Sequence, residues 1–195
     1  NNNVNRISAT NVGNLPTIGA PKILVFEITF EGYDERMNHF DQFSELEDLL
    51  FSEENKYGRN DSNFDSLRSY YYRSSYGKLD ITGDVYRTTI SSNYTSVVQV
   101  AQYLVLAYQD IDFSNYDSNN DGYIDGFYIV FKTFTPFGDP VNVTPLNLSL
   151  EVDGYYISQL CILNSASGLN TYVHETYHMF GFPDVYGGVA VSPNG

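Results

Sequence analysis

Apolar residues along the chain follow two periods, and the changes between them predict alternating strands and helices. Residues 23–30, ILVFEITF, form a β-rich run suited to a buried strand. Apolar positions at helical spacing then predict helices over residues 41–51 and from about residue 62 to a stop at Gly77. A strand through residues 79–85 completes this half of the chain.

The second half repeats the alternation and ends in a helix that carries unusual chemistry. Residues 134–147 are expected to be a loop because they contain Pro136, Gly138, Pro140 and Pro145. The remaining segments are predicted as a helix over residues 95–108, a strand over 127–131, a hairpin of strands 148–152 and 155–163 around Asp153-Gly154, and a helix over 168–180. The order predicts one α+β domain with a mixed sheet.

Composition restricts the class of partner. A net charge of −14 would repel a phosphate backbone or an anionic membrane surface at long range, so neither nucleic acid nor membrane is expected as a partner. Cys161 is the only cysteine, which excludes an internal disulfide. Residues 1–20 are rich in Asn, Gly, Thr and Pro and are expected to be an N-terminal arm or a linker remnant.

His174, Glu175 and His178 form an HExxH sequence within the last predicted helix. Residues four apart on a helix differ by only about 40° around the axis, so both imidazoles project to one side and can bind one zinc ion. The carboxylate between them is then free to act as a general base. With three His in the whole chain, chance would produce this spacing in roughly a few of a thousand such chains.

Gly181 and Asp184 extend the predicted zinc site. A glycine just past the helix permits a left-handed turn, which would return Asp184 towards the imidazoles as a third ligand. The alternative is that Asp184 is an ordinary turn residue beside Pro183. His39 is expected to be a surface or packed histidine, because a catalytic zinc needs an open position for water.

The segment HETYHMFGFPD at 174–184 is similar to the HExxHxxGxPD motif of the immune inhibitor A-like family of secreted bacterial metallopeptidases. The likeness extends to KILVFEITF at 22–30, YYYRSSYGKLDITGDVY at 70–86 and YDSNNDGYIDGFYIVF at 116–131, in the same order of elements. The resemblance implies a zincin/metzincin-like fold over residues 21–195, with His174, His178 and Asp184 on Zn²⁺ and Glu175 as the catalytic base.

The sequence departs from this family after the third ligand. Members are expected to have a Met-containing turn beneath the zinc, yet the only methionines are Met37 and Met179. We therefore expect either a catalytic domain truncated on its C-terminal side or one that lacks this support. Val173, Tyr177 and Phe180 lie at core spacing on the last helix and are expected to pack, but less completely if the domain is truncated.

A second metal is predicted between residues 117 and 125, where the sequence reads D-x-N-x-D-G-x-x-D. Its oxygen ligands for Ca²⁺ would be the side chains of Asp117, Asn119, Asp121 and Asp125 with the carbonyl of Tyr123. Asp110 or Asp112 could assist. The twelfth position is Tyr128 rather than Glu, so the loop is not an EF-hand. The alternative is an Asn/Asp-rich surface turn without an ion.

These features predict a secreted, extracellular bacterial zinc endopeptidase that takes protein or peptide substrates. Two other classes stay open. One is a metal-stabilised binding or adhesion module of the same fold that has lost turnover, and the other is a zinc hydrolase of a different substrate.

Overall fold

The computed structural model describes residues 13–35, 46–53, 66–138 and 143–184. The expectations for residues 1–12, for His39 and Met37, and for the first parts of the two helices predicted from residues 41 and 62 lie outside these ranges, as does everything after Asp184.

Five strands form one mixed sheet with the order β2-β1-β3-β5-β4. The strands are β1 (Lys22–Phe30), β2 (Thr82–Ile90), β3 (Gly126–Phe131), β4 (Val143–Val152) and β5 (Tyr155–Asn164). All neighbours are parallel except β4, which runs antiparallel to β5 at one edge. The α+β class and the mixed sheet expected from the sequence are confirmed.

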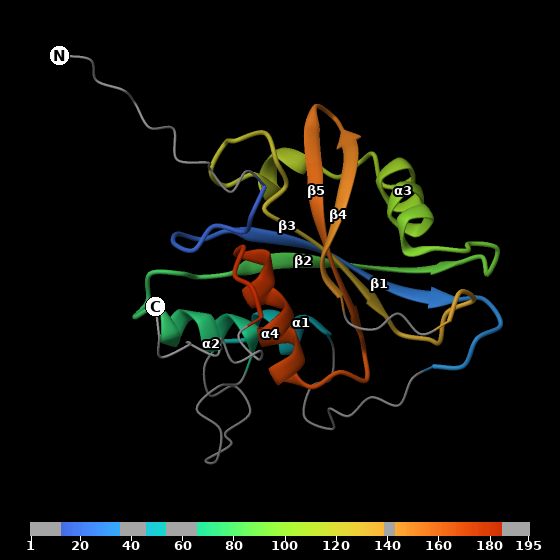
Figure 1. Cartoon of the computed structure of the whole chain (residues 1–195), viewed down its shortest axis with the longest axis horizontal. Helices are drawn as coiled ribbons and strands as arrows, with labels where there is room; N and C mark the ends of the chain where they lie inside the picture. The colour runs from blue at the N-terminus through green and yellow to red at the C-terminus, as the bar shows by residue number, and fades with distance from the viewer. Residues whose placement is uncertain (1–12, 36–45, 54–65, 139–142, 185–195) are drawn as a thin grey trace, which may run out of the picture.

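Helices cover both faces of the sheet, which is why the central strand β3 is buried along its whole length and β1 along most of it. Figure 1 shows α1 (Leu46–Phe51), α2 (Leu67–Ser74) and α4 (Leu169–Met179) together on one face, with α3 (Val97–Ala107) on the other. Successive residues of a strand point to opposite faces. Accordingly Leu24 and Phe26 of β1 pack in the core beneath α3, whereas Ile23 and Val25 pack in the core with α4.

The segment 134–147 is not a loop throughout, because β4 already begins at Val143. Proline lacks the backbone N–H that a residue of a central strand donates, so Pro145 predicts a loop at this position. Among the described strands β4 has only β5 as a neighbour, and the register with β5 is irregular between Val143 and Leu146. An edge position with a register shift tolerates the proline.

The hairpin from β4 to β5 turns at Asp153 and Gly154, as predicted. Their φ angles are 50° and 84°, both in the left-handed region that a tight two-residue hairpin turn requires. The strand predicted over residues 79–85 begins at Thr82, with Leu79 and Ile81 buried just before it.

Residues 13–16 of the predicted N-terminal arm pack against the domain, whereas residues 17–20 are exposed and bond it through the backbone of Gly19. Leu15 is only 1% exposed and lies in the core with α4. At Gly13 (φ 78°) an added Cβ would lie 2.1 Å from the hydroxyl oxygen of Ser158, so a side chain there would collide with β5. We call residues 13–16 the N-terminal strap.

Candidate metal centre

His174 and His178 lie on α4, the helix that the sequence predicted. Their rings are 4.6 Å apart and nearly perpendicular, with an interplanar angle of 86°. The imidazole Nε2 atoms face each other at 3.1 Å. His178 is buried and His174 is partly exposed, so one side of the pair is accessible from solvent.

Three buried tyrosines hold this helix in place. The Tyr128 hydroxyl of β3 donates to Thr176 Oγ1 at 3.0 Å, and the Tyr71 hydroxyl of α2 donates to the Val173 carbonyl at 2.7 Å. Tyr172 donates to the carbonyl of Asn164, the last residue of β5, at 3.2 Å. Burial raises the pKa of all three phenols well above the ordinary value, so they remain donors at neutral pH.

No pattern in the sequence predicted these tyrosine anchors. Each hydroxyl donates to an acceptor on another element, whereas the aromatic content of the sequence, 16%, predicts only core and surface packing. Together the three bonds tie α4 to strands β3 and β5 and to helix α2, so the imidazoles are carried by a fixed backbone.

The turn after α4 takes the conformation expected of Gly181. Its φ is 85°, and its amide donates to the His178 carbonyl at 2.8 Å. The carbonyl of Phe182 then lies 2.8 Å from His178 Nδ1. A carbonyl only accepts, so Nδ1 carries the proton and Nε2 keeps a lone pair for a metal.

The same turn brings Asp184 to the two imidazoles. Its Oδ1 lies 3.3 Å from His174 Nε2 and 3.2 Å from His178 Nε2. Within the described ranges, these three residues are the only group of His, Cys, Asp or Glu whose ligand atoms all lie within 4.8 Å of one another. The convergence predicted from the HExxH-xx-G-xx-D spacing is present.

The spacing of these three atoms fits a tetrahedral metal better than it fits hydrogen bonds. Bonds of about 2.0–2.1 Å at tetrahedral angles place ligand atoms about 3.3 Å apart, and the three separations here are 3.1, 3.2 and 3.3 Å. A charge-assisted bond from an imidazolium to a carboxylate would be shorter, about 2.7–2.9 Å. The donor set of two imidazoles and one carboxylate also suits zinc.

Glu175 occupies the position between the two ligands and is 7% exposed. No hydrogen bond or ion pair joins its side chain to another residue of the described part of the chain. The carboxylate therefore has no described partner that would compete with a water or a substrate for it.

The stripe of Val173, Tyr177 and Phe180 packs only in part. Phe180 is buried against Tyr71, whereas Val173 and Tyr177 are half-buried. The fully covered face of α4 consists instead of Tyr172, Thr176 and Met179. Helical spacing alone did not separate these two faces, because both contain large residues at intervals of three and four.

The N-terminal strap caps the C-terminal end of α4. The backbone amide of Leu15 donates to the Met179 carbonyl at 2.9 Å, and the side-chain amide nitrogen of Asn14 lies 3.5 Å from the Phe180 carbonyl oxygen. Carbonyls in the last turn of a helix have no partner within the helix. The strap supplies partners for two of them immediately before the turn that carries Asp184.

The loop of residues 117–125 differs from the imidazole site in what its side chains bond. The Asp117 carboxylate accepts from the amides of Asp121 at 3.0 Å and Gly122 at 2.9 Å. Asp121 accepts from the Tyr123 amide at 2.9 Å, and the Asn119 side chain bonds both the amide and the carboxylate of Asp121. The ligand side chains predicted for Ca²⁺ thus already bond the loop's own backbone.

Asp125 is the buried member of this loop, at 1% exposed. Its carboxylate accepts from the Ser118 amide at 2.9 Å. Burial, with a smaller contribution from the charges of Asp117 and Asp121, raises its pKa to about 6. Asp112, considered as a helper, instead caps the short 3₁₀ helix Phe113–Tyr116 by accepting from the Ser114 amide. Tyr128 lies fully buried in β3, as its strand position predicted.

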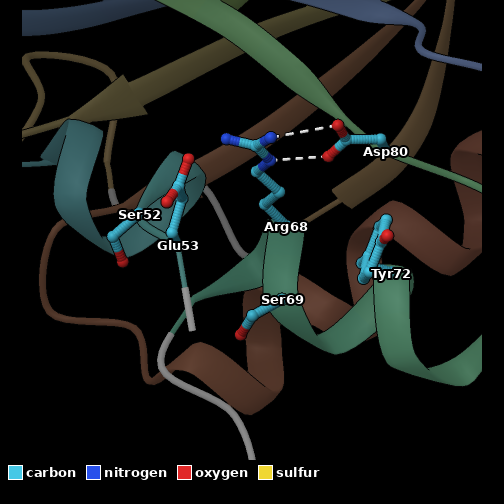
Figure 2. A pocket seen from close by; sticks show the side chains of 6 residues that line it. All are labelled: Ser52, Glu53, Arg68, Ser69, Tyr72 and Asp80. Atoms are coloured by element: carbon cyan, nitrogen blue, oxygen red, sulfur yellow. Dashed lines mark hydrogen bonds and ion pairs between the residues drawn. The ribbon is translucent and has the colours of Figure 1, made fainter. Parts of the chain in front are cut away.

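A hollow of about 300 Å³ lies elsewhere on the molecule, and its described lining includes none of the residues of the imidazole cluster. Figure 2 shows its centre, where the Arg68 guanidinium faces the Asp80 carboxylate with bonds of 2.6 and 3.0 Å. Ser52, Glu53, Ser69 and Tyr72 complete its lining. The one cation of its described lining is paired with an internal acid, whereas the end of α4 brings three ligand atoms together, so the imidazole cluster is the stronger candidate.

No helix in the described part of the chain is long and apolar enough to cross a membrane. Comparison with protein-family models and with curated proteins found no match to this chain. The candidate site therefore stands on its own geometry: two imidazoles, a carboxylate and a neighbouring glutamate at one end of an anchored helix.

Proposed function

We propose that this protein is a zinc-dependent endopeptidase with a zincin-like catalytic domain. The observation that supports the proposal most is the triangle of His174 Nε2, His178 Nε2 and Asp184 Oδ1, with sides of 3.1–3.3 Å beside a buried Glu175. Secretion and a bacterial origin are part of the same proposal and are supported only by the resemblance of the 174–184 motif.

Each residue of the site has a role in peptide hydrolysis. Zinc held by His174, His178 and Asp184 would polarise the scissile carbonyl and lower the pKa of the attacking water. Glu175 accepts a proton from that water and delivers it to the leaving amine. The carbonyl of Phe182 keeps the His178 imidazole in the ligating tautomer, and the tyrosine anchors keep both imidazoles in register.

The substrate backbone is accommodated at the edge of the sheet. Among the described strands β4 pairs only with β5, so its other side offers amides and carbonyls to an extended peptide. β4 lies close to α4, which brings a strand added there towards the metal. A sheet edge recognises main chain, and this favours a peptide over the other substrates that a zinc hydrolase could take.

Calcium is the second metal in the proposal, with a structural role. Loop 117–125 joins the 3₁₀ helix to β3, and Asp117 and Asp121 concentrate negative charge around the buried Asp125. A bound Ca²⁺ would neutralise that charge and stabilise the folded chain.

Replacement of the proposed base tests the function directly. In zinc-loaded protein, Glu175→Gln should lower hydrolysis of labelled casein by about 10²- to 10⁴-fold while one zinc per chain is retained, since the ligands are unchanged. Glu31→Gln, the same change at an exposed residue beyond β1, is the matched control and should leave turnover intact. Zinc binding without any casein or peptide hydrolysis in the unmodified protein would favour the binding-module alternative.

A further inference from the structure

A hollow of about 270 Å³ lies beside the candidate metal centre, between α2 and α4. It is lined by Tyr70, Tyr71, Asn170, Val173, His174 and Tyr177. Its volume is just below the roughly 300–1,000 Å³ of small-molecule pockets, which leaves room for one large side chain rather than a whole cofactor.

Four of the six residues that line this hollow are tyrosine or valine: Tyr70, Tyr71, Val173 and Tyr177. The rings of Tyr70 and Tyr71 meet edge to face at 5.1 Å, and Tyr177 stacks on Phe182 at 4.7 Å with an interplanar angle of 18°. The Tyr71 hydroxyl is already committed to the Val173 carbonyl. Aromatic walls of this kind favour a flat or branched apolar group, which gains both burial and ring contacts.

Among the described residues that line the hollow, no side chain could form an ion pair with a charged group of the substrate. None of the six residues is Lys, Arg, Asp or Glu. A charged side chain entering the hollow would lose hydration without gaining an ion pair, which is costly. The one amide, on exposed Asn170, lies one helical turn before His174.

His174 belongs both to this hollow and to the metal centre. Tyr177 links the two as well, because its ring stacks on Phe182 in the turn that carries Asp184. A peptide held with its scissile carbonyl at the metal would therefore place a neighbouring side chain against this wall.

We infer that the hollow between α2 and α4 is a specificity pocket that selects a large uncharged side chain, Phe, Tyr or Leu, next to the scissile bond. This inference rests on the proposed endopeptidase function. It adds that α2, through Tyr70 and Tyr71, takes part in substrate selection, although this helix carries no metal ligand.

The test compares cleavage of matched peptides that differ at one position. Zinc-loaded protein is given a peptide library, the cleaved bonds are identified by mass spectrometry, and kcat/KM is measured for peptides with Phe, Leu, Ala, Asp or Lys beside the bond. Phe and Leu peptides should exceed the Ala peptide by about 10- to 100-fold, and the Asp and Lys peptides should be poorest.

Val173→Phe fills the hollow and should lower the Phe-to-Ala ratio of kcat/KM by about 10-fold. Val98→Phe makes the same change at a position 37% exposed on α3 and should leave the ratio unaltered. Asn170→Trp at the exposed mouth is a second variant that does not disturb the core. The affinity of a labelled Phe peptide is also measured at equilibrium with zinc-loaded Glu175→Gln protein, with and without Val173→Phe. This measurement tests the pocket without turnover.

The outcomes separate the pocket from the reaction. Cleavage with no preference, or a preference unchanged in both Val173→Phe and Asn170→Trp, would overturn the pocket and leave the endopeptidase standing. Zinc-loaded protein that cleaves no peptide would overturn the proposed function and the pocket with it.

Discussion

The two predicted metal sites differ in what their ligand atoms bond. At the end of α4, the Nε2 atoms of His174 and His178 and Oδ1 of Asp184 face one another at 3.1–3.3 Å. In loop 117–125, the carboxylates of Asp117 and Asp121 accept from backbone amides of the same loop. The ligand atoms of the first site converge on one point, whereas the carboxylates of the second site bond the backbone amides of their own loop.

This difference shows why motif spacing has different strength in helices and loops. A helix holds side chains four residues apart on one side regardless of what they bind. A loop rich in Asp and Asn can satisfy its backbone through those same side chains, with or without an ion. We therefore expect zinc to depend on single residues, and calcium to act as a modest stabiliser.

The largest expected effect is the loss of zinc on removal of the third ligand. Asp184→Ala should weaken zinc affinity by at least about 100-fold, because a first-coordination contact is worth more than the outer contacts that cost about 10- to 100-fold. Competition with a zinc-responsive chelator measures the affinity. Asp34→Ala, at an exposed residue after β1, is the control. Equal affinity in the two variants would show that Asp184 is a turn residue only.

Calcium should stabilise the folded chain by a smaller amount. At calcium concentrations about 10 to 100 times Kd, the free energy of unfolding should rise by about 1.4–2.7 kcal/mol, and Tm by several degrees. Thermal denaturation of zinc-loaded protein with and without added Ca²⁺ measures the shift. Asp121→Asn removes one charge without changing the side-chain shape and should abolish the calcium-dependent rise in Tm. A melting curve indifferent to Ca²⁺ would make the loop an ordinary turn.

Without metals, the loop should make stability depend on pH. Because Asp125 has a pKa of about 6 in the folded chain, above the ordinary value near 4, the folded state holds this proton more tightly than the unfolded state. Its contribution is therefore full below about pH 4 and is lost as pH rises through about 6, by about 3 kcal/mol.

Urea unfolding of metal-free protein at pH 4.5 and 7.5 checks the sign of this effect. Asp125→Asn cannot ionise, so the difference between the variant and the unmodified protein isolates this one carboxyl. Equal pH dependence in both proteins would mean that Asp125 titrates normally in the folded chain.

The smallest expected effect is at the N-terminal strap. Leu15→Pro removes the amide that donates to the Met179 carbonyl, and Leu15→Ala removes the buried side chain but keeps that amide. If the strap positions the turn with Asp184, zinc affinity should fall about 10-fold further in Leu15→Pro than in Leu15→Ala. Isothermal titration of both variants with zinc gives the comparison, and equal affinities would limit the strap to a role in packing.

The sequence alone determined the features that depend on a few neighbouring residues. The spacing of His174 and His178, the left-handed turn at Gly181 and the hairpin at Asp153 and Gly154 could be predicted because helix and turn geometry are local. The same holds for the burial of β1 and β3, whose apolar runs are characteristic of a parallel sheet covered on both faces.

Only the tertiary structure decided what depends on residues far apart in the chain. It brought the tyrosine anchors into contact with α4 and packed the N-terminal strap against the end of that helix. It also determined that β4 begins at Val143 and that Tyr177 lies half-buried beside the metal centre. Tyr128 and Thr176 are 48 residues apart, and Asn14 and Phe180 are 166 apart. No local period encodes such contacts, because they form only when the sheet has brought its elements together.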